Sequence, residues 1–161
     1  MTGAMLGTTH PTSRRTTDMT TNTQTRNQKL IEISIAYCKQ TLVDWESFGF
    51  STEQAVDYSN SFAPAGDLAE LAEYRFRLTG QLETHDGIAW TGIISRNGED
   101  VVNVEQEGRG GSNFYFPTTA GAEGYAKVKE YLAVAKRAYS GLEYEQADHA
   151  TAILDLADTP A

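Results

Sequence analysis

The chain has 161 residues, a formal net charge of −9, and 40% hydrophobic and 10% aromatic residues. This composition suffices for one folded domain and excludes a wholly disordered chain, while no apolar run reaches the roughly 20 residues that span a bilayer. The single cysteine, Cys38, excludes an internal disulfide and a cysteine-based zinc site.

The N-terminal segment, residues 1–26, is rich in threonine and contains few large apolar side chains. Such a segment cannot bury enough surface to offset the entropy that it loses on ordering. We therefore predict a disordered tail over residues 1–26 and a single α+β domain over residues 27–161. Met19 is an alternative start, which leaves open whether residues 1–18 belong to the natural protein.

The first element expected in the domain covers residues 28–45, where two apolar patterns overlap. Apolar residues alternate from Ile31 to Tyr37 as in a strand, but they also recur at helical spacing through the segment. The absence of Gly and Pro over this length favours a helix. Ser51 and Gln54 then have the spacing of a capping box, which predicts a second, short helix.

The centre of the chain predicts an antiparallel meander, because its apolar residues alternate with polar ones. The alternating stretches cover residues 74–82, 88–95 and 100–106. Asp86-Gly87 and Asn97-Gly98 separate them, and the second pair suits a type I′ turn, which needs positive φ at both central positions. Residues 114–116 are either a short fourth strand or an ordered loop. One face of the first strand carries its apolar residues, namely Tyr74, Phe76, Leu78 and Leu82.

After Pro117 the composition becomes helical. An apolar stripe predicts a helix over residues 120–139, which would cover one face of the sheet. A last helix is expected over residues 142–157, and from Gly141 onward the chain has five acids and no lysine or arginine. The predicted fold class is α+β: a three- to four-stranded antiparallel meander packed against helices, with an N-terminal helical part and a C-terminal helical pair.

The strongest candidate site is the sequence NVEQEGRGGSNFYFP, residues 103–117. Its glycines permit positive φ, and successive backbone N–H groups in such a turn can hold an anion. An arginine adds a planar charged group, and an aromatic residue adds a stacking platform. The spacing matches neither a Walker loop nor a dinucleotide fingerprint, and the alternative is a wide, glycine-bent connection between strands. The candidate ligand-binding residues in this loop are Gly108, Arg109, Gly110, Gly111, Asn113 and Tyr115.

A local basic patch would support an anionic ligand on an otherwise acidic protein. Arg75 and Arg77 lie on the polar face of the first predicted strand, where they could join Arg96 and Arg109. The alternative is pairing with acids on neighbouring strands. Trp90 lies on the middle strand, and we expect it near the Gly-rich loop. Arg75, Arg77 and Trp90 are therefore further candidate ligand-binding residues, and the alternative for Trp90 is a place in the core.

Two carboxylate–histidine pairs would be the basis of a metal-dependent enzyme. Glu83 and His85 alternate on one side of a strand, and Glu145 and His149 are four residues apart on a helix. The alternatives are a plain hairpin tip for the first pair and a solvated helix face for the second. We expect no metal and no cofactor.

The segment GIAWTGIISRNGEDVVNVEQEGRGGSNFYF, residues 87–116, resembles a pattern in small uncharacterised proteins of phages and bacterial mobile elements. In that pattern a strand with an aromatic residue leads through an NG-type turn to a Val-rich strand and an NxGxGG-N-Y loop. The chain departs from it at Glu107, where a small polar acid or amide often stands. The resemblance implies a phage or prophage accessory protein and no particular activity. The matching positions are Trp90, Asn97-Gly98, Val101–Val104, Gly108–Gly111, Asn113 and Tyr115.

These observations favour a small, non-enzymatic, cytoplasmic binding protein whose Gly-rich loop and adjacent sheet face hold a small anionic or nucleotide-like ligand. Two other functions remain open: an acidic interaction module that inhibits a host protein or mimics nucleic acid, and a small metal-dependent hydrolase. The negative charge argues against nucleic acid as a partner, and no membrane contact is expected. The edges of the sheet need cover, which a homodimer or the helices would supply.

Overall fold

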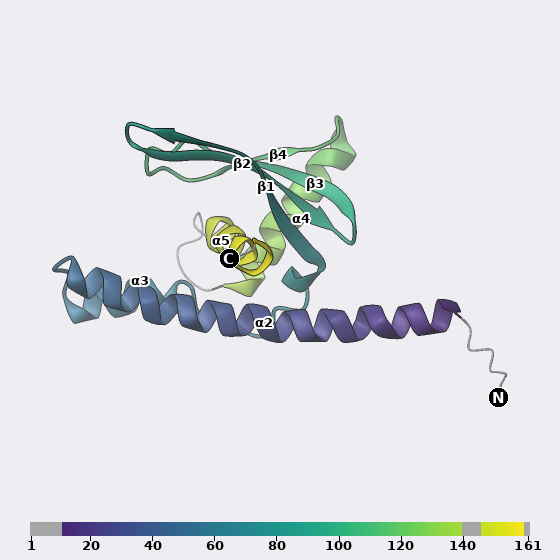
Figure 1. Cartoon of the computed structure of the whole chain (residues 1–161), viewed down its shortest axis with the longest axis horizontal. Coiled ribbons are helices and arrows are strands. Elements are labelled where there is room, and N and C mark those ends of the chain that lie inside the picture. Colours follow the sequence, from purple (N-terminus) through teal and green to yellow (C-terminus); the bar gives the residue numbers. More distant parts are fainter. Residues whose placement is uncertain (1–10, 140–145, 160–161) are drawn as a thin grey trace.

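The computed structural model describes residues 11–139 and 146–159, and for residues 11–24 it describes the backbone alone. A four-stranded antiparallel sheet is covered by helices on one face, as Figure 1 shows. The helix α5 (Gln146–Asp158) lies between the sheet and the long helix α2 (Pro11–Ser47), while α4 (Ala122–Ala138) packs against the third and fourth strands. The predicted α+β fold is thus confirmed, with an N-terminal helical part and a C-terminal helical pair.

The sheet is the meander that the sequence predicts, and residues 114–117 form its fourth strand. The order is β1-β2-β3-β4, and all neighbouring pairs are antiparallel. Asn97 and Gly98 have φ values of 50° and 87°, as a type I′ turn requires. The strands are β1 (Tyr74–Thr84), β2 (Gly87–Arg96), β3 (Glu99–Gln106) and β4 (Phe114–Pro117).

A bulge in β1 changes which side chains face the helices. Leu78 pairs with Gly92, but Gly80 pairs with Thr91, so β1 has one extra residue between these pairs. Because side chains alternate along a strand, the extra residue reverses the two faces beyond it. Leu82 therefore lies on the outer face and is 68% exposed, and its predicted place on the buried apolar face is wrong.

The core lies between the inner face of the sheet and the helices. The ring of Phe76 covers Gly92, where a Cβ atom would lie 2.4 Å from a ring carbon, so a larger residue there would have to displace the ring. Tyr74 and Tyr131 meet edge to face with their ring centres 5.1 Å apart. The largest fully buried side chains are Tyr74, Tyr131, Tyr139, Leu30, Leu68, Leu71, Ile94, Ile153 and Leu154.

The helices α2 and α3 (Thr52–Asn60) form an antiparallel hairpin. Ser51 caps α3: its side chain accepts a hydrogen bond from the N–H of Gln54, and the Gln54 side chain accepts one from the N–H of Ser51. The predicted capping box is therefore confirmed. Within the described residues, no helix combines the length and the apolar character needed to cross a membrane.

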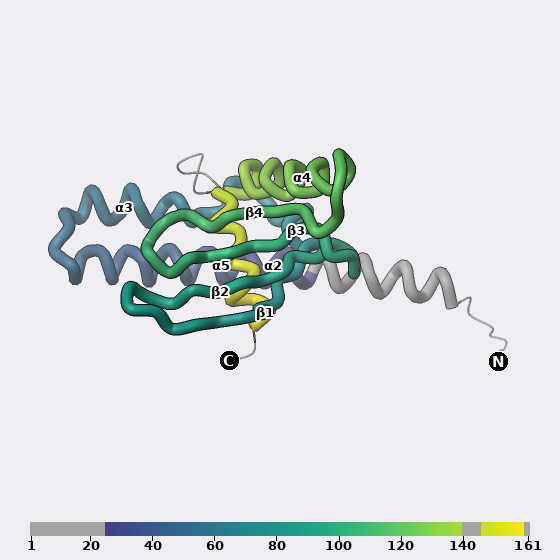
Figure 2. Tube along the Cα trace, turned by 90° about the horizontal axis from the view of Figure 1, so that it is seen from above, coloured from purple at the N-terminus to yellow at the C-terminus, as the bar shows by residue number. Residues whose placement is uncertain are grey.

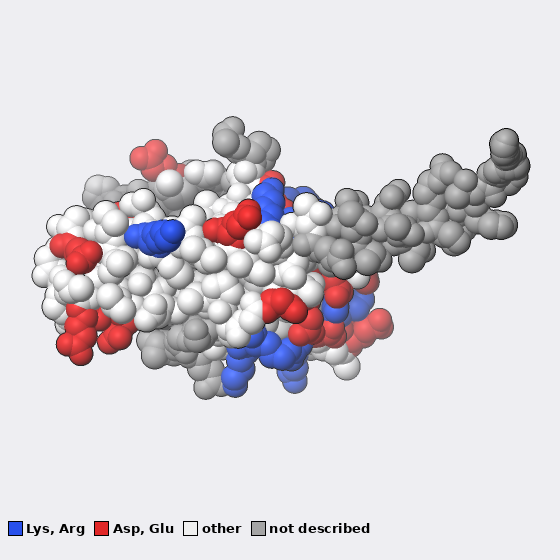
Figure 3. Space-filling model, turned by 90° about the horizontal axis from the view of Figure 1, so that it is seen from below, with Lys and Arg blue, Asp and Glu red and all other residues white. Residues whose placement is uncertain are grey.

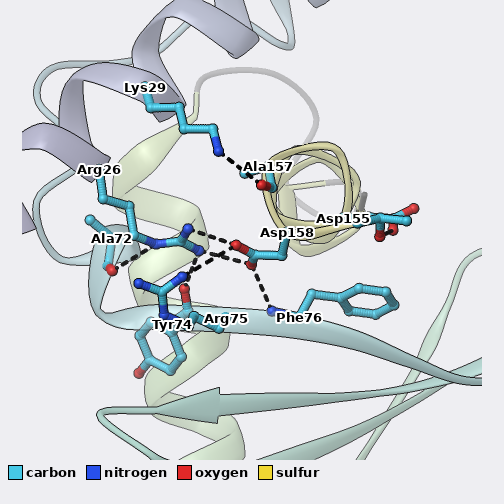
Figure 4. Close-up of polar contacts among 10 residues, drawn as sticks. Arg26, Lys29, Ala72, Tyr74, Arg75, Phe76, Asp155, Ala157 and Asp158 are labelled. Carbon is cyan, nitrogen blue, oxygen red and sulfur yellow. Dashed lines mark hydrogen bonds and ion pairs between the residues drawn. The ribbon is translucent and has the colours of Figure 1, made fainter. Parts of the chain in front are cut away.

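Arg26, which the sequence places in a disordered tail, is buried in the structure (Figure 4). Its Nε donates to the Ala72 carbonyl at 3.1 Å, and its Nη2 donates to the Tyr74 carbonyl at 2.7 Å. Its two terminal nitrogens also bind the Asp158 carboxylate at 2.7 and 2.9 Å. Asp158 in turn accepts the N–H of Phe76 at 2.9 Å.

The Arg26–Asp158 pair covers the start of the edge strand β1. β1 is an edge strand, and the pair binds backbone groups of β1 and of the turn before it. Without the pair, these backbone groups would need another strand to hydrogen-bond with them. The partner of Arg26 is 132 residues away along the chain, so local composition could not reveal its burial.

Candidate functional site

The Gly-rich loop between β3 and β4 closes around the side chain of Gln106. The amide oxygen of Gln106 accepts the N–H of Gly108 at 3.0 Å. Its amide nitrogen donates to the Gly111 carbonyl at 3.0 Å and to the Asn113 side chain at 2.7 Å. Gly108 and Gly110 have φ values of 80° and 83°, so the loop does require glycine. The protein's own amide thus binds one of the backbone N–H groups that were expected to face an anion, that of Gly108.

Close packing fixes this loop against the β1–β2 hairpin. A Cβ atom on Gly108 would lie 2.7 Å from the carbonyl carbon of Ile88. A Cβ atom on Gly87 would likewise lie 2.7 Å from the Gly108 carbonyl oxygen. The two backbones approach closely because neither glycine has a side chain, so the loop has a definite position beside the sheet.

Asn113 and Tyr115 connect the loop and β4 to α5. The Tyr115 hydroxyl donates to the Asp148 carboxylate at 2.7 Å and lies 3.1 Å from the Thr151 hydroxyl. The N–H of Asn113 donates to the same carboxylate at 3.3 Å. Burial, and then the nearby Tyr131 and Asp148, raise the pKa of the Tyr115 phenol far above its ordinary value. The Tyr115 phenol therefore stays protonated, and both residues hold the loop and β4 against α5 through hydrogen bonds.

The structure does not bring the four arginines of the predicted basic patch together. Arg96 ends β2, whereas the Gly-rich loop, with the exposed Arg109, lies against the start of that strand. The hydrogen bond from Arg77 holds the pKa of Asp100 below its usual range, so this acid stays ionised. The acids that pair with the other three arginines are Asp100 for Arg77, Glu73 and Glu130 for Arg96, and Asp158 for Arg75.

Trp90 lies on the inner face of the sheet, toward the helices. Its ring meets Phe76 edge to face, with the ring centres 5.6 Å apart. Trp90 pairs with Gln106 on β3, so it is near the start of the Gly-rich loop, as expected.

A hollow of about 570 Å³ lies on the outer face of the sheet, beside the loop. Figure 2 looks onto this face, which no described helix covers. A second hollow of about 250 Å³ adjoins it and shares Thr91, Glu105 and Phe116 with it. The side chains that characterise the larger hollow are Leu82, Thr91, Glu105, Glu107, Phe114 and Phe116.

The walls of this hollow combine aromatic rings with carboxylates. Phe114 and Phe116 are 47% and 42% exposed, and their rings are nearly parallel with centres 6.4 Å apart. In the sheet register Glu105 lies between Thr91 and Phe114, so a carboxylate stands next to an exposed ring. Of the described residues that line the hollow, none is a lysine or arginine. The charge of the hollow therefore favours a positive group and opposes an anion.

Neither carboxylate–histidine pair is part of a metal site that the structure describes. Within residues 11–139 and 146–159, no group of three or more His, Cys, Asp or Glu side chains could hold a metal ion. Glu83 and His85 are exposed near the β1–β2 turn, and Glu145 lies outside the described residues. His149 is buried, and its Nδ1 is 3.1 Å from the Ser61 carbonyl oxygen.

The only cysteine also has the environment of a packing residue. Cys38 is half-buried on α2. Burial raises the pKa of the Cys38 thiol above its ordinary value, so the thiolate needed for nucleophilic attack is disfavoured.

No protein-family model matches the chain significantly, and no curated protein or solved structure does so. The phage or prophage origin implied by residues 87–116 stays a prediction.

Proposed function

We propose that this protein is a non-enzymatic binding protein whose ligand occupies the hollow on the outer sheet face, beside the Gly-rich loop. The observation that carries the proposal is the hollow itself, about 570 Å³ in volume. Small-molecule sites occupy roughly 300–1,000 Å³ and combine apolar walls with a few polar groups. Strands form the floor here, and the bonds that close the loop on Gln106 make one rim rigid.

The ligand that fits best has a flat apolar body and a positive charge. The exposed rings of Phe114 and Phe116 offer faces for stacking, and aromatic faces also attract cations. Glu105 and Glu107 add negative charge at the same place. An organic amine or guanidinium attached to an aromatic or aliphatic body therefore satisfies both features.

The anionic or nucleotide-like ligand expected from the sequence is the competing proposal. It depends on Arg109, which is exposed on the loop two residues beyond Glu107. Arg77 and Arg96 contribute less, because acids already neutralise them. Arg75 lies on the first strand, away from the loop, and shares Asp158 with Arg26.

The two proposals are separated by ligands that differ in charge alone. Phenethylamine and phenylpropionate share a ring on a short chain and carry opposite charges, and AMP represents the nucleotide-like alternative. Two-dimensional ¹H–¹⁵N NMR of the full chain detects even millimolar binding. We expect the amine to shift signals of residues 105–107 and 114–116, and the two anions to leave them unchanged.

Variants identify the groups that hold the amine. Glu105→Gln and Phe114→Ala should each weaken binding roughly two- to fivefold, the size of exposed charge and cation–π interactions. Glu53→Gln, the same change on α3 and away from the sheet, is the matched control and should have no effect. Binding of AMP that Arg109→Ala abolishes would establish the anionic alternative. If none of the three ligands shifts these signals, the outer face is not the site.

A further inference from the structure

A second surface, independent of the hollow, lies at the tip of the α2–α3 hairpin, residues 43–57. Figure 2 shows that this hairpin tip extends beyond the end of the sheet. Phe48, between the two helices, is 76% exposed, a high value for a side chain of this size. The other exposed large apolar side chains of the hairpin tip are Val43, Phe50 and Val56, between 37% and 58% exposed.

Aromatic contacts and a capped helix start hold the backbone of the hairpin tip in one conformation. The Trp45 ring stacks on Tyr58 with centres 4.0 Å apart, and it contacts Phe50 at 4.3 Å. Gly49, with φ of 95°, turns the chain after α2, and the capping box at Ser51 starts α3. An apolar group held in this way loses little conformational entropy when a partner covers it, so the hairpin tip is pre-organised for binding.

The surface of the hairpin is negatively charged. From Gln40 to Tyr74 the sequence has seven acids and no lysine, arginine or histidine. Glu70 and Glu73 pair with arginines of α4 and β2, and Asp67 bonds a backbone N–H of its own turn. Figure 3 shows red carboxylates around the end of the molecule that the hairpin tip forms. The four acids there that pair with no described lysine or arginine are Asp44, Glu46, Glu53 and Asp57.

We infer that the hairpin tip is a docking surface for a basic, amphipathic segment of a partner protein. Apolar side chains of the partner cover Phe48 and Phe50, and its lysines or arginines face the surrounding carboxylates. A central apolar contact within a charged rim is the usual anatomy of a protein interface. The rim charges steer the encounter, so binding weakens as salt rises.

The same charge excludes the other kinds of occupant. A membrane surface attracts basic amphipathic helices, because its cytoplasmic leaflet is negative, and it repels an acidic one. Nucleic acid is repelled for the same reason. A second copy of this chain docking tip to tip would place like charges opposite each other, which is costly at an interface.

The test uses the full chain and a short, fluorescently labelled amphipathic helical peptide of leucine and lysine, with binding followed by anisotropy. A peptide in which glutamate replaces every lysine is the charge control. We expect the lysine peptide to bind, the glutamate peptide not to bind, and added salt to weaken the complex. Phe48→Ser should weaken binding at least tenfold, because burying a phenylalanine stabilises a contact by an amount equivalent to about that factor or more.

Tyr125→Ser is the control, since it removes an exposed aromatic ring on α4, which belongs neither to the hairpin tip nor to the hollow. It should leave the affinity for the lysine peptide unchanged. Phe48 is exposed, so Phe48→Ser should unfold at the wild-type temperature, which separates lost binding from lost folding. The inference is overturned if the wild type does not bind the lysine peptide, or if Phe48→Ser binds it as well as the wild type. Equal losses in Phe48→Ser and Tyr125→Ser would also overturn it.

Discussion

Replacing Arg26 with methionine removes the charge that connects α2 to β1 and α5. Methionine keeps an unbranched apolar side chain in the same place, so the main loss is the guanidinium. That group makes four hydrogen bonds, two to Asp158 and one each to the carbonyl oxygens of Ala72 and Tyr74. The substitution therefore isolates the polar contribution of this pair to stability.

The magnitude follows from how little water reaches the pair. The side chains of Arg26 and Asp158 are 7% and 8% exposed. Without Arg26, the partners that the buried carboxylate keeps among the described residues are the N–H of Phe76 and the more distant Arg75, 3.6 Å away. Leaving one partner of a buried pair uncompensated costs about 3–5 kcal/mol. At about 2–4 °C per kcal/mol for a chain of this size, the midpoint of thermal unfolding should fall by about 6–20 °C.

Urea unfolding followed by circular dichroism measures the loss. Arg109→Met, at an exposed arginine, is the matched control and should change stability by less than about 0.5 kcal/mol. Asp158→Asn keeps an oxygen that can accept from Phe76, so adding it to Arg26→Met should restore part of the stability. The reasoning is refuted if Arg26→Met costs less than about 1 kcal/mol, or if the two substitutions are simply additive.

Two further predictions concern the Gly-rich loop and the buried tyrosines. Gly108→Ala should lower the free energy of unfolding by about 3 kcal/mol, because it combines positive φ with a Cβ atom 2.7 Å from Ile88. Gly110→Ala also has positive φ but meets open space, so it should lower that free energy by about 1 kcal/mol. Equal losses in urea unfolding would contradict the packing of the loop on β2. Burial raises the pKa of Tyr139 from 10.0 to about 12, even though a hydrogen bond with Ser34 opposes the shift. As pH rises, the Tyr139 phenol of the unfolded chain therefore loses its proton before that of the folded chain does. The contribution of Tyr139 to the free energy of unfolding is intact below pH 10 and falls between pH 10 and pH 12 by about 1.4 kcal/mol per pH unit. Tyr139→Phe should reduce the slope of stability against pH between about pH 10 and 12 by up to that amount. An unchanged slope would show that this tyrosine is not responsible.

The parts of the fold that local patterns determine were predictable. Alternation of apolar residues predicted the strands, and the turn dipeptides predicted where the chain reverses. Asn97-Gly98 adopts the two positive φ values that its residue types allow, and Ser51 and Gln54 form the capping box that their spacing suggests. In each case the residues that interact are within a few positions of one another.

The parts that depend on distant residues were not predictable. Alternation cannot locate the bulge after Leu78, because an extra residue in β1 is defined by its pairing with β2. This is why Leu82 lies on the outer face, where it helps to form the hollow. Arg26 likewise belongs to a polar, threonine-rich stretch, and only its contact with Asp158 explains its burial.

The position of the Gly-rich loop beside the sheet was predictable, but its internal hydrogen bonds were not. The Gly-rich loop does border the hollow, through Glu107, but the amide of Gln106 fills the loop. Phe114 and Phe116 alternate around Tyr115, a spacing that already placed two rings on one face of a strand. The hairpin tip was missed, although the lack of any basic residue from Gln40 to Tyr74 is visible in the sequence.

The Arg26–Asp158 pair also has a consequence for the order of events during synthesis. Arg26 is translated 132 residues before Asp158. At about 5–20 residues per second, the ribosome needs roughly 7–26 seconds to add the intervening chain. During that interval α2 lacks the carboxylate that its arginine binds, and from the synthesis of β1 onward the edge of that strand lacks its cover. The nascent chain therefore has an open sheet edge until α5 emerges, and it is in this interval that a chaperone would have most to protect.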